Sequence, residues 1–164
     1  MSKRNFLATA GAALGAIVSG CSRPSPAAAN GNFEVTRTPA EWKKILSPAS
    51  YAVLREGNTE RSGSSPLNGE HRQGTYACAG CDLPLYASAA KFESGTGWPS
   101  FTAPIPNAVG TKEDNTLFMS RMEVHCRRCG GHLGHVFDDG PPPTGKRYCM
   151  NGAAMNFIAT PFMQ

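Results

Sequence analysis

The sequence has little net charge and no long hydrophobic run. Charged residues make up 17% of its 164 residues, and the formal net charge is +4. Lys3 and Arg4 contribute two of these charges, so the chain beyond its N-terminal segment carries +2 and lacks the basic footprint of a nucleic-acid-binding protein. The apolar run from Phe6 to Val18 is too short to span a bilayer as a stable anchor. We therefore expect neither a nucleic-acid partner nor a membrane-spanning helix.

Coiled-coil periodicity is also absent, and the only internal repeat is a pair of CxxC motifs. Instead, 18 glycines and 13 prolines are typical of short strands joined by turns. From Gly74 onward, β-like segments alternate with turns, at residues 75–77, 83–86, 116–119, 121–125, 135–137, 147–151 and 156–159. This spacing predicts antiparallel sheets in a single, mainly β domain.

Two short helices are predicted before the strands. Thr38-Pro39-Ala40-Glu41 combines a helix cap, a proline in the first turn and a glutamate placed for a capping box. The apolar residues that follow are expected on one face of this helix: Trp42, Ile45 and Leu46. A second helix is predicted to start at Ser47-Pro48 and to stop at Gly57. Residues 58–70 are polar and rich in turn formers, and we interpret them as a surface loop.

Residues 1–21 are typical of an export signal, because two basic residues precede the apolar run and small residues follow it. Residues 2–7 (SKRNFL) also resemble a twin-arginine signal in which lysine replaces the first arginine. The sequence therefore predicts an exported protein that is either periplasmic or anchored to the membrane and facing the periplasm.

Two processing sites compete within the N-terminal segment. Residues 18–21 (VSGC) resemble a bacterial lipobox, in which Cys21 would be acylated and become the mature N-terminus. Residues 27–29 (AAA) resemble an ordinary cleavage site, whose use would remove Cys21. We favour the lipobox because Cys21 closely follows the apolar run. Residues 22–37 would then be a flexible linker to a domain spanning residues 38–164.

Four of the six cysteines form two CxxC motifs: Cys78, Cys81, Cys126 and Cys129. Four thiolates suit a tetrahedral structural Zn²⁺ site, which leaves no open position for a substrate and so stabilises the fold without catalysing a reaction. Disulfides in an exported protein and a redox-active CxxC are the alternatives. The duplicated spacing favours zinc.

Cys149 stands apart from the CxxC motifs and from the N-terminal segment. In a strand over residues 147–151, side chains alternate, so Arg147, Cys149 and Asn151 would share one face. A nearby cation increases the fraction of a thiol present as the nucleophilic thiolate. The alternative is that Cys149 is a small buried residue without chemistry.

Two further segments contain side chains suited to catalysis or binding. His132 and His135 form an HxxH motif that could donate a proton, but positions three apart face opposite ways in a regular strand, so both can serve only if the strand bulges near Gly134. A second metal site or two structural histidines are the alternatives. Trp98 lies in a glycine-rich loop over Ser94–Phe101, where it either belongs to the core or walls a pocket.

Together, these segments resemble the B-type peptide-methionine (R)-S-oxide reductases. The resemblance covers residues 38–162 in the family's order and is carried by Cys78–Leu85 (CAGCDLPL), Ser94–Phe101 (SGTGWPSF), Cys129–Pro141 (CGGHLGHVFDDGP) and Arg147–Asn151 (RYCMN). It implies two antiparallel sheets with short N-terminal helices and a structural zinc on the four cysteines. Enzymes of this class reduce one epimer of methionine sulfoxide.

The resemblance also implies a role for each candidate residue. Cys149 would attack the sulfoxide sulfur and become a sulfenic acid, while His132 and His135 position and protonate the oxygen. Arg147 and Asn151 would support the catalytic cysteine. The residues expected to contact the substrate are Trp98, which would hold its methyl group, and Phe137, Asp138 and Asp139.

Thr96 stands where many family members have a resolving cysteine. We therefore expect a one-cysteine cycle, in which an external thiol such as that of a thioredoxin-like protein reduces the sulfenic acid. The expected substrate is methionine (R)-sulfoxide in oxidised proteins, and the expected oligomeric state is a monomer. The alternative from another functional class is a zinc-stabilised binding module of the same fold, in which Cys149 is inert.

Overall fold

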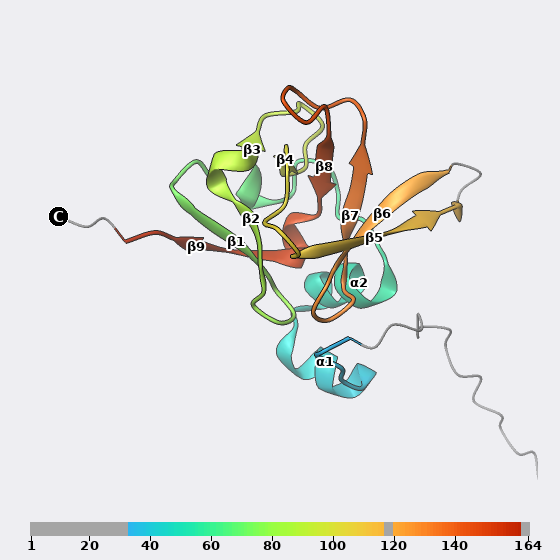
Figure 1. Ribbon diagram of the computed structural model, residues 1–164. Helices are drawn as coiled ribbons and strands as arrows, with labels where there is room; N and C mark the ends of the chain where they lie inside the picture. The colour runs from blue at the N-terminus through green and yellow to red at the C-terminus, as the bar shows by residue number, and fades with distance from the viewer. Residues whose placement is uncertain (1–32, 117–119, 162–164) are drawn as a thin grey trace, which may run out of the picture.

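The computed structural model describes residues 33–116 and 120–161, which form two antiparallel sheets and two short α-helices (Figure 1). The helices are α1 (Pro39–Ile45) and α2 (Pro48–Glu56), and the 3₁₀ helices are η1 (Pro66–Gly69), η2 (Ser88–Ala90) and η4 (Gly152–Ala154). The strands are β1 (Gly74–Cys78), β2 (Pro84–Ala87), β3 (Lys91–Phe92), β4 (Ser100–Phe101), β5 (Val109–Asp114), β6 (Arg121–Cys126), β7 (His132–Phe137), β8 (Arg147–Met150) and β9 (Met155–Ala159). The predicted mainly β fold is confirmed.

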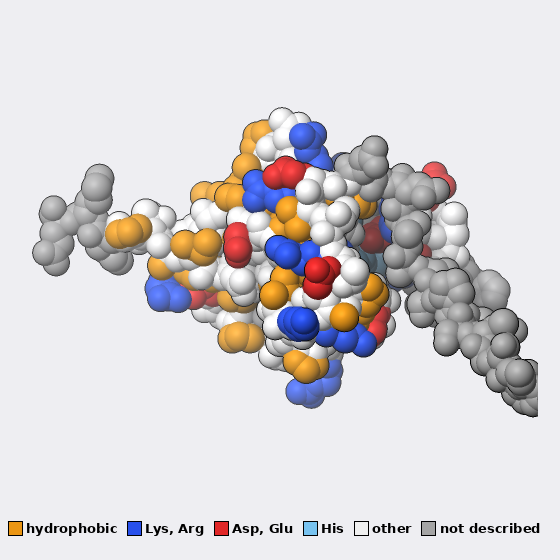
Figure 2. Space-filling view, turned by 90° about the horizontal axis from the view of Figure 1, so that it is seen from below, with side chains coloured by type: hydrophobic (Ala, Val, Ile, Leu, Met, Phe, Trp, Pro, Cys, Tyr) orange, Lys and Arg blue, Asp and Glu red, His pale blue; other side chains and the backbone are white. Residues whose placement is uncertain are grey.

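The smaller sheet has the strand order β2-β1-β9, and the larger has the order β3-β4-β8-β7-β6-β5. Figure 1 shows the two helices together at one end of the molecule, where α2 packs against β7 and η4. None of the helices in the described part of the chain has the length and apolar character needed to cross a membrane. In Figure 2, the face seen from this end carries basic, acidic and hydrophobic side chains interspersed, without a large patch of one sign.

An aromatic cluster joins the two sheets and forms the centre of the core. The rings of Tyr86 (β2) and Phe101 (β4) stack with their centroids 4.3 Å apart, and Tyr76 (β1) meets Phe101 edge-on at 4.9 Å. All three side chains are fully buried. The Tyr86 hydroxyl also donates a hydrogen bond to the Met150 sulfur at 3.1 Å. Stacked and edge-on aromatic pairs add to the free energy of area burial, so this cluster fixes β8 against the smaller sheet.

Both helices start where the sequence predicts, and the second also stops where it predicts. Thr38 and Glu41 form the capping box at α1, and Gly57 ends α2 with φ = 71°, in the left-handed region that glycine adopts without strain. Trp42 and Leu46 are buried, as expected. Ile45 is 55% exposed, so its predicted place on the buried face is wrong. The helix ends at Ile45, and Leu46 is already in an extended conformation.

The five residues 33–37, which the sequence analysis placed in the linker, pack against the second CxxC motif. The Phe33 ring lies edge-on to His125 with the centroids 5.9 Å apart, and Val35 donates a backbone hydrogen bond to Arg128 at 3.0 Å. These contacts make residues 33–37 part of the folded domain. The export signal and the rest of the linker lie outside the described residues.

Six of the predicted β segments are strands, whereas the segment at 116–119 is not confirmed as one. Thr116 lies beyond the end of β5, and residues 117–119 are outside the described residues. Strands β3, β4 and β5 are not among the predicted segments. Strands β3 and β4 have two residues each, too few to show alternation, and β5 is a largely polar edge strand whose central residues are exposed.

Strand β7 contains the bulge that the HxxH spacing requires. Val124 pairs with Gly134 and the next residue, His125, pairs with His132, so Leu133 is an extra residue in the ladder. Gly134 has φ = 157°, and a side chain there would place its Cβ atom 2.1 Å from the Cys149 carbonyl oxygen. Only glycine allows β7 and β8 to approach this closely.

Replacing Gly134 with alanine should destabilise the fold, because the new methyl group collides with the β8 backbone. We expect the free energy of unfolding to fall by more than about 1 kcal/mol, measured by urea denaturation. Gly69→Ala is the matched control, since a Cβ atom there meets nothing within 4 Å and the backbone needs no positive φ. Equal denaturation midpoints for the two variants would contradict this account of the bulge.

Candidate active site and metal centre

Cys149 lies in β8, between a serine on one neighbouring strand and a histidine on the other. The register pairs Cys149 with Ser100 of β4 and with His135 of β7. Its side chain is half-buried. Cys149 therefore remains accessible while its two flanking strands supply polar neighbours.

The bulge at Leu133 brings both histidines of the HxxH motif together. The rings of His132 and His135 lie 5.5 Å apart between centroids, at an interplanar angle of 65°. Their side chains are 9% and 12% exposed. Without the extra residue they would lie on opposite faces of the sheet. The condition that the sequence analysis set for joint action of the two residues is met.

Each histidine pairs with a carboxylate from the β5–β6 hairpin that sequence reasoning missed. His135 Nε2 lies 2.7 Å from Asp114 Oδ2, and His132 Nδ1 lies 3.0 Å from Glu123 Oε1. Such a carboxylate fixes the orientation and tautomer of its imidazole. The second nitrogen of His132, Nε2, is buried and has no hydrogen-bond partner within the described part of the chain. One histidine nitrogen is thus left for a ligand.

The electrostatics of these pairs keep the carboxylates ionised. Hydrogen bonds from Thr116 and His135 hold the pKa of Asp114 well below its ordinary value. Burial has the largest single effect on the pKa of Glu123 and raises it, but the hydrogen bonds and positive charges of His132 and Lys112 together outweigh burial and lower the pKa of that carboxyl. Burial also lowers the pKa of His135, and the hydrogen bond to Asp114 offsets this effect only in part.

Arg147 is held beside Cys149 by two contacts with β7 and the turn after it. Its guanidinium makes a bidentate pair with Asp139, with both N–O distances 2.8 Å, and lies 4.4 Å from the Phe137 ring centroid. The salt bridge to Asp139 and, more weakly, the nearby Cys149 sulfur raise the pKa of Arg147. Asp138 is exposed and pairs instead with Lys146. Of the two acids predicted at the site, Asp139 is the one that touches Arg147.

Glu60 connects two candidate residues, although the sequence analysis assigned it to a surface loop. Its backbone carbonyl accepts a hydrogen bond from Trp98 Nε1 at 3.1 Å, and its backbone N–H donates to Asn151 Oδ1 at 3.0 Å. Its carboxylate accepts from the backbone N–H groups of Gly152 and Ala153, at the start of η4. No sequence motif indicates this role, because it depends on backbone atoms and on residues about ninety positions away.

Asn151 is buried and lies just beyond the end of β8, where it secures the bulge. Its side-chain amide donates to the Leu133 carbonyl at 3.0 Å, and its backbone N–H donates to the same oxygen at 2.8 Å. Asn151 thus links the Glu60 loop to the extra residue of β7. It holds the histidine-bearing strand in place from within the fold.

A cavity of about 480 Å³ opens beside Thr96 and Arg147. Thr96 lines it from the glycine-rich loop and Arg147 from β8, together with Phe92, Glu93, Ser94, Asp139, Gly140 and Pro141. Thr96 Oγ1 lies 3.8 Å from Cys149 Sγ. A molecule in this cavity would meet Arg147 and Thr96.

The four CxxC cysteines converge into a single cluster between the sheets. Their sulfur atoms all lie within 4.8 Å of one another, and the shortest distances run between the motifs: 3.5 Å for Cys81–Cys126 and 3.7 Å for Cys78–Cys129. Sulfurs bound tetrahedrally to Zn²⁺ at about 2.3 Å are about 3.8 Å apart. A disulfide would bring two of them to about 2.05 Å. The geometry fits a zinc site with four cysteine ligands.

The two motifs build matching turns around this cluster. Asp82 and Gly130 each donate a backbone hydrogen bond to the first cysteine of their motif, at 2.8 and 2.9 Å, and both have positive φ. Arg55 of α2 lies 3.4 Å from the Cys129 sulfur through Nη2. Hydrogen bonding to Cys126 and burial raise the pKa of the Cys78 thiol and so disfavour its thiolate form. A bound divalent cation would stabilise that thiolate.

Comparison with known proteins agrees with this site. The SelR domain family matches residues 46–159, which contain all four zinc ligands, both histidines and Cys149. The chain belongs to the SelR-domain family. Among its relatives, the peptide methionine sulfoxide reductase MsrB of Methanosarcina barkeri is 54% identical over 124 residues, covering 75% of this chain and 87% of that protein.

Other members of the family have similar sequence identity to this chain. MsrB of Agrobacterium fabrum is 50% identical over 125 residues, covering 76% of this chain and 93% of the relative. The chloroplastic peptide methionine sulfoxide reductase B1 of Arabidopsis thaliana is 52% identical over 120 residues, covering 73% of this chain and 59% of the relative. The resemblance drawn from the sequence motifs is confirmed, and the four-cysteine cluster is the structural zinc site expected of the SelR fold.

Loss of the zinc site should destabilise the domain, whereas loss of the Cys149 thiol should not. We expect one Zn²⁺ per chain, and we expect Cys126→Ser to lose the metal and to lower the thermal midpoint by about 10 °C or more. Metal content and thermal unfolding measure both effects. Cys149→Ser is the control and should retain metal and midpoint. A metal-free Cys126→Ser protein with unchanged stability would contradict the structural role.

Proposed function

We propose that the protein reduces the R epimer of methionine sulfoxide, mainly in oxidised proteins, to methionine. The arrangement of Cys149 carries the proposal: a half-buried thiol paired in register with His135, whose neighbours Arg147 and Thr96 line a cavity. The proteins that it resembles at about 50% identity are peptide methionine sulfoxide reductases. The alternative of a non-catalytic binding module is not favoured, because it explains neither the accessible thiol nor the two histidine–carboxylate pairs.

The reaction begins with attack of the Cys149 thiolate on the sulfoxide sulfur. Arg147 supports the thiolate by its positive charge. The sulfoxide oxygen accepts a proton and moves as hydroxide from the substrate sulfur to the Cys149 sulfur, while the bond formed between the two sulfur atoms breaks and its electron pair returns to the methionine sulfur. His132 is suited to this contact, because its Nε2 is the buried nitrogen left without a partner within the described chain and Glu123 holds its Nδ1. The products are methionine and Cys149 in the sulfenic acid form.

The substrate methyl group would pack against Trp98. The indole is fixed by its hydrogen bond to the Glu60 carbonyl, so its face is presented in one orientation. Aromatic faces make favourable contacts with sulfur-bearing side chains. Recognition of one epimer then requires the methyl group and the oxygen to occupy different places, at Trp98 and at the histidines respectively.

Regeneration of Cys149 requires an external thiol. Thr96 occupies the place of a resolving cysteine, and the other four cysteines in the described residues form the zinc site. One thiol of the reductant attacks the sulfenic acid sulfur. The hydroxyl group leaves as water, and a mixed disulfide forms between Cys149 and the reductant. A second thiol then releases Cys149 and leaves the reductant as a disulfide. A thioredoxin-like protein is suited to supply both thiols.

The test of this function is turnover of separated R and S epimers of a peptide methionine sulfoxide with dithiothreitol as reductant. Dithiothreitol carries both thiols, so no protein partner is needed. We expect turnover of the R epimer alone, and a loss of at least about 10³-fold in Cys149→Ser, because the nucleophile is removed. A folded, zinc-containing protein that reduces neither epimer would overturn the proposal. Activity surviving in Cys149→Ser would overturn the mechanism.

We also propose that the protein acts outside the cytoplasm, anchored by a lipid on Cys21. The support is the sequence pattern of residues 1–21, which lie outside the described residues. The mature protein should begin at an acylated Cys21, as measured by mass spectrometry of the N-terminal peptide from its native host. An unmodified N-terminus at Asn30 would exclude the anchor while leaving export in place.

A further inference from the structure

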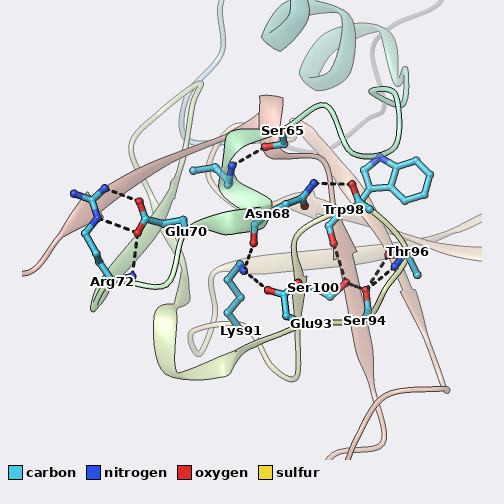
Figure 3. A network of polar contacts seen from close by, with 12 residues as sticks. Ser65, Asn68, Glu70, Arg72, Lys91, Glu93, Ser94, Thr96, Trp98 and Ser100 are labelled. Atoms are coloured by element: carbon cyan, nitrogen blue, oxygen red, sulfur yellow. Dashed lines mark hydrogen bonds and ion pairs between the residues drawn. The ribbon is translucent and has the colours of Figure 1, made fainter.

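Three hydroxyl groups form a chain that runs from Cys149 into the interior. Thr96 Oγ1 lies 3.8 Å from Cys149 Sγ and 2.8 Å from Ser94 Oγ, which lies 2.7 Å from Ser100 Oγ. The chain ends where the Ser100 hydroxyl donates to the Trp98 carbonyl at 3.2 Å. Figure 3 shows the hydroxyls of Ser94, Thr96 and Ser100 meeting beneath Trp98. Ser100 is only 1% exposed, so its hydroxyl depends on these partners.

The loop that carries Thr96 is held in one conformation. Ser62 donates a hydrogen bond to the Thr96 carbonyl at 2.9 Å, and Asn68 donates to the Gly97 carbonyl at 2.8 Å. Gly97 has φ = 88°, and a Cβ atom there would lie 2.1 Å from the Ser62 hydroxyl. Because the loop is fixed from both sides, the position of the Thr96 hydroxyl is set before a substrate binds.

The hydrogen bonds of this chain of hydroxyl groups can run in either of two directions, depending on whether Cys149 carries a proton. When Cys149 is a thiol, its S–H donates to Thr96, Thr96 to Ser94, Ser94 to Ser100, and Ser100 to the Trp98 carbonyl. When Cys149 is a thiolate, rotation of the three hydroxyls reverses the order. Ser100 then donates to Ser94, Ser94 to Thr96, and Thr96 to the sulfur. Only the 3.2 Å hydrogen bond from Ser100 to the Trp98 carbonyl is lost.

We propose that Thr96 is the hydrogen-bond donor that stabilises and orients the Cys149 thiolate, with Ser94 and Ser100 as positioning residues that let its hydroxyl reverse direction. This inference rests on the proposed function and adds a role for the residue that replaces a resolving cysteine. Hydrogen bonds to a charged group are stronger than neutral ones. The chain therefore favours the nucleophilic form without a buried charge of its own.

Other polar groups around Cys149 do not duplicate this contact. Arg147 approaches the sulfur from the same strand but is shared with Asp139. His135 of β7 pairs in register with Cys149 of β8, and its Nε2 is hydrogen-bonded to Asp114. On the β4 side, Ser100 acts through Ser94 and Thr96. Removal of the Thr96 hydroxyl should thus leave the charges of the site in place and remove only its hydrogen bonds to Cys149 and Ser94.

Two substitutions of Thr96 separate the hydroxyl from the volume of the side chain. Thr96→Val keeps the shape and removes the hydroxyl, whereas Thr96→Ser keeps the hydroxyl and removes a methyl group. In the full-length protein, the rate at which iodoacetamide alkylates Cys149 is measured against pH. Mass spectrometry of the peptide containing Cys149 excludes contributions from Cys21 and the zinc ligands. Zinc content and thermal midpoint confirm that each variant is folded.

We expect Thr96→Val to move the midpoint of the alkylation profile upward by about one pH unit and to lower kcat for the R epimer roughly tenfold, as loss of a hydrogen bond to a charged group implies. Thr96→Ser should follow the unsubstituted protein in both assays. Ser94→Ala should show a smaller shift in the same direction, because Thr96 then loses the partner that orients it. This variant keeps the test valid if Thr96→Val does not fold.

The outcomes distinguish this inference from the proposed function. Coincident alkylation profiles for the unsubstituted protein, Thr96→Val and Ser94→Ala would overturn the role of the hydroxyl chain, whatever the turnover. Equal displacement of Thr96→Ser and Thr96→Val would also overturn it, because volume and not the hydroxyl would then be responsible. Absence of R-epimer turnover in the unsubstituted protein would refute the function, while the alkylation profiles would still report on the hydrogen bond.

Discussion

The site depends above all on the register of β7 between β6 and β8. One extra residue, Leu133, allows His132 and His135 to face the same side, and the pairing of His135 with Cys149 brings that side to the thiol. Asn151 secures the bulge through the Leu133 carbonyl. A slip of one residue would send the histidines to the opposite face. The chemistry is therefore a property of the sheet's hydrogen bonding as much as of its side chains.

The parts of the structure that local sequence patterns encode were predictable. The capping box at Thr38, the helix stop at Gly57 and the paired CxxC motifs each depend on residues close together in the chain, and the structure places them as expected. The need for a bulge near Gly134 also followed from spacing alone. Family resemblance supplied the roles of the catalytic residues, which spacing could not.

The parts that the sequence did not reveal depend on distant residues. Asp114 and Glu123 reach the histidines only because β5 and β6 pair beside β7, and an acidic residue within a strand carries no signature of that role. Glu60 acts through its backbone N–H and carbonyl as well as its carboxylate, and its partners lie far along the chain. The packing of residues 33–37 on the second CxxC motif becomes visible only once that motif is folded.

The position of Glu60 has a consequence for how such an active site can change. One residue joins the indole of Trp98, the amide of Asn151 and the start of η4, although these lie in two segments far apart in the chain. The loop after α2, the glycine-rich loop and the segment after Cys149 thus behave as a single structural module. Exchange of any one of them between related enzymes would leave hydrogen-bond partners unmatched in the other two, so their sequences are expected to evolve together.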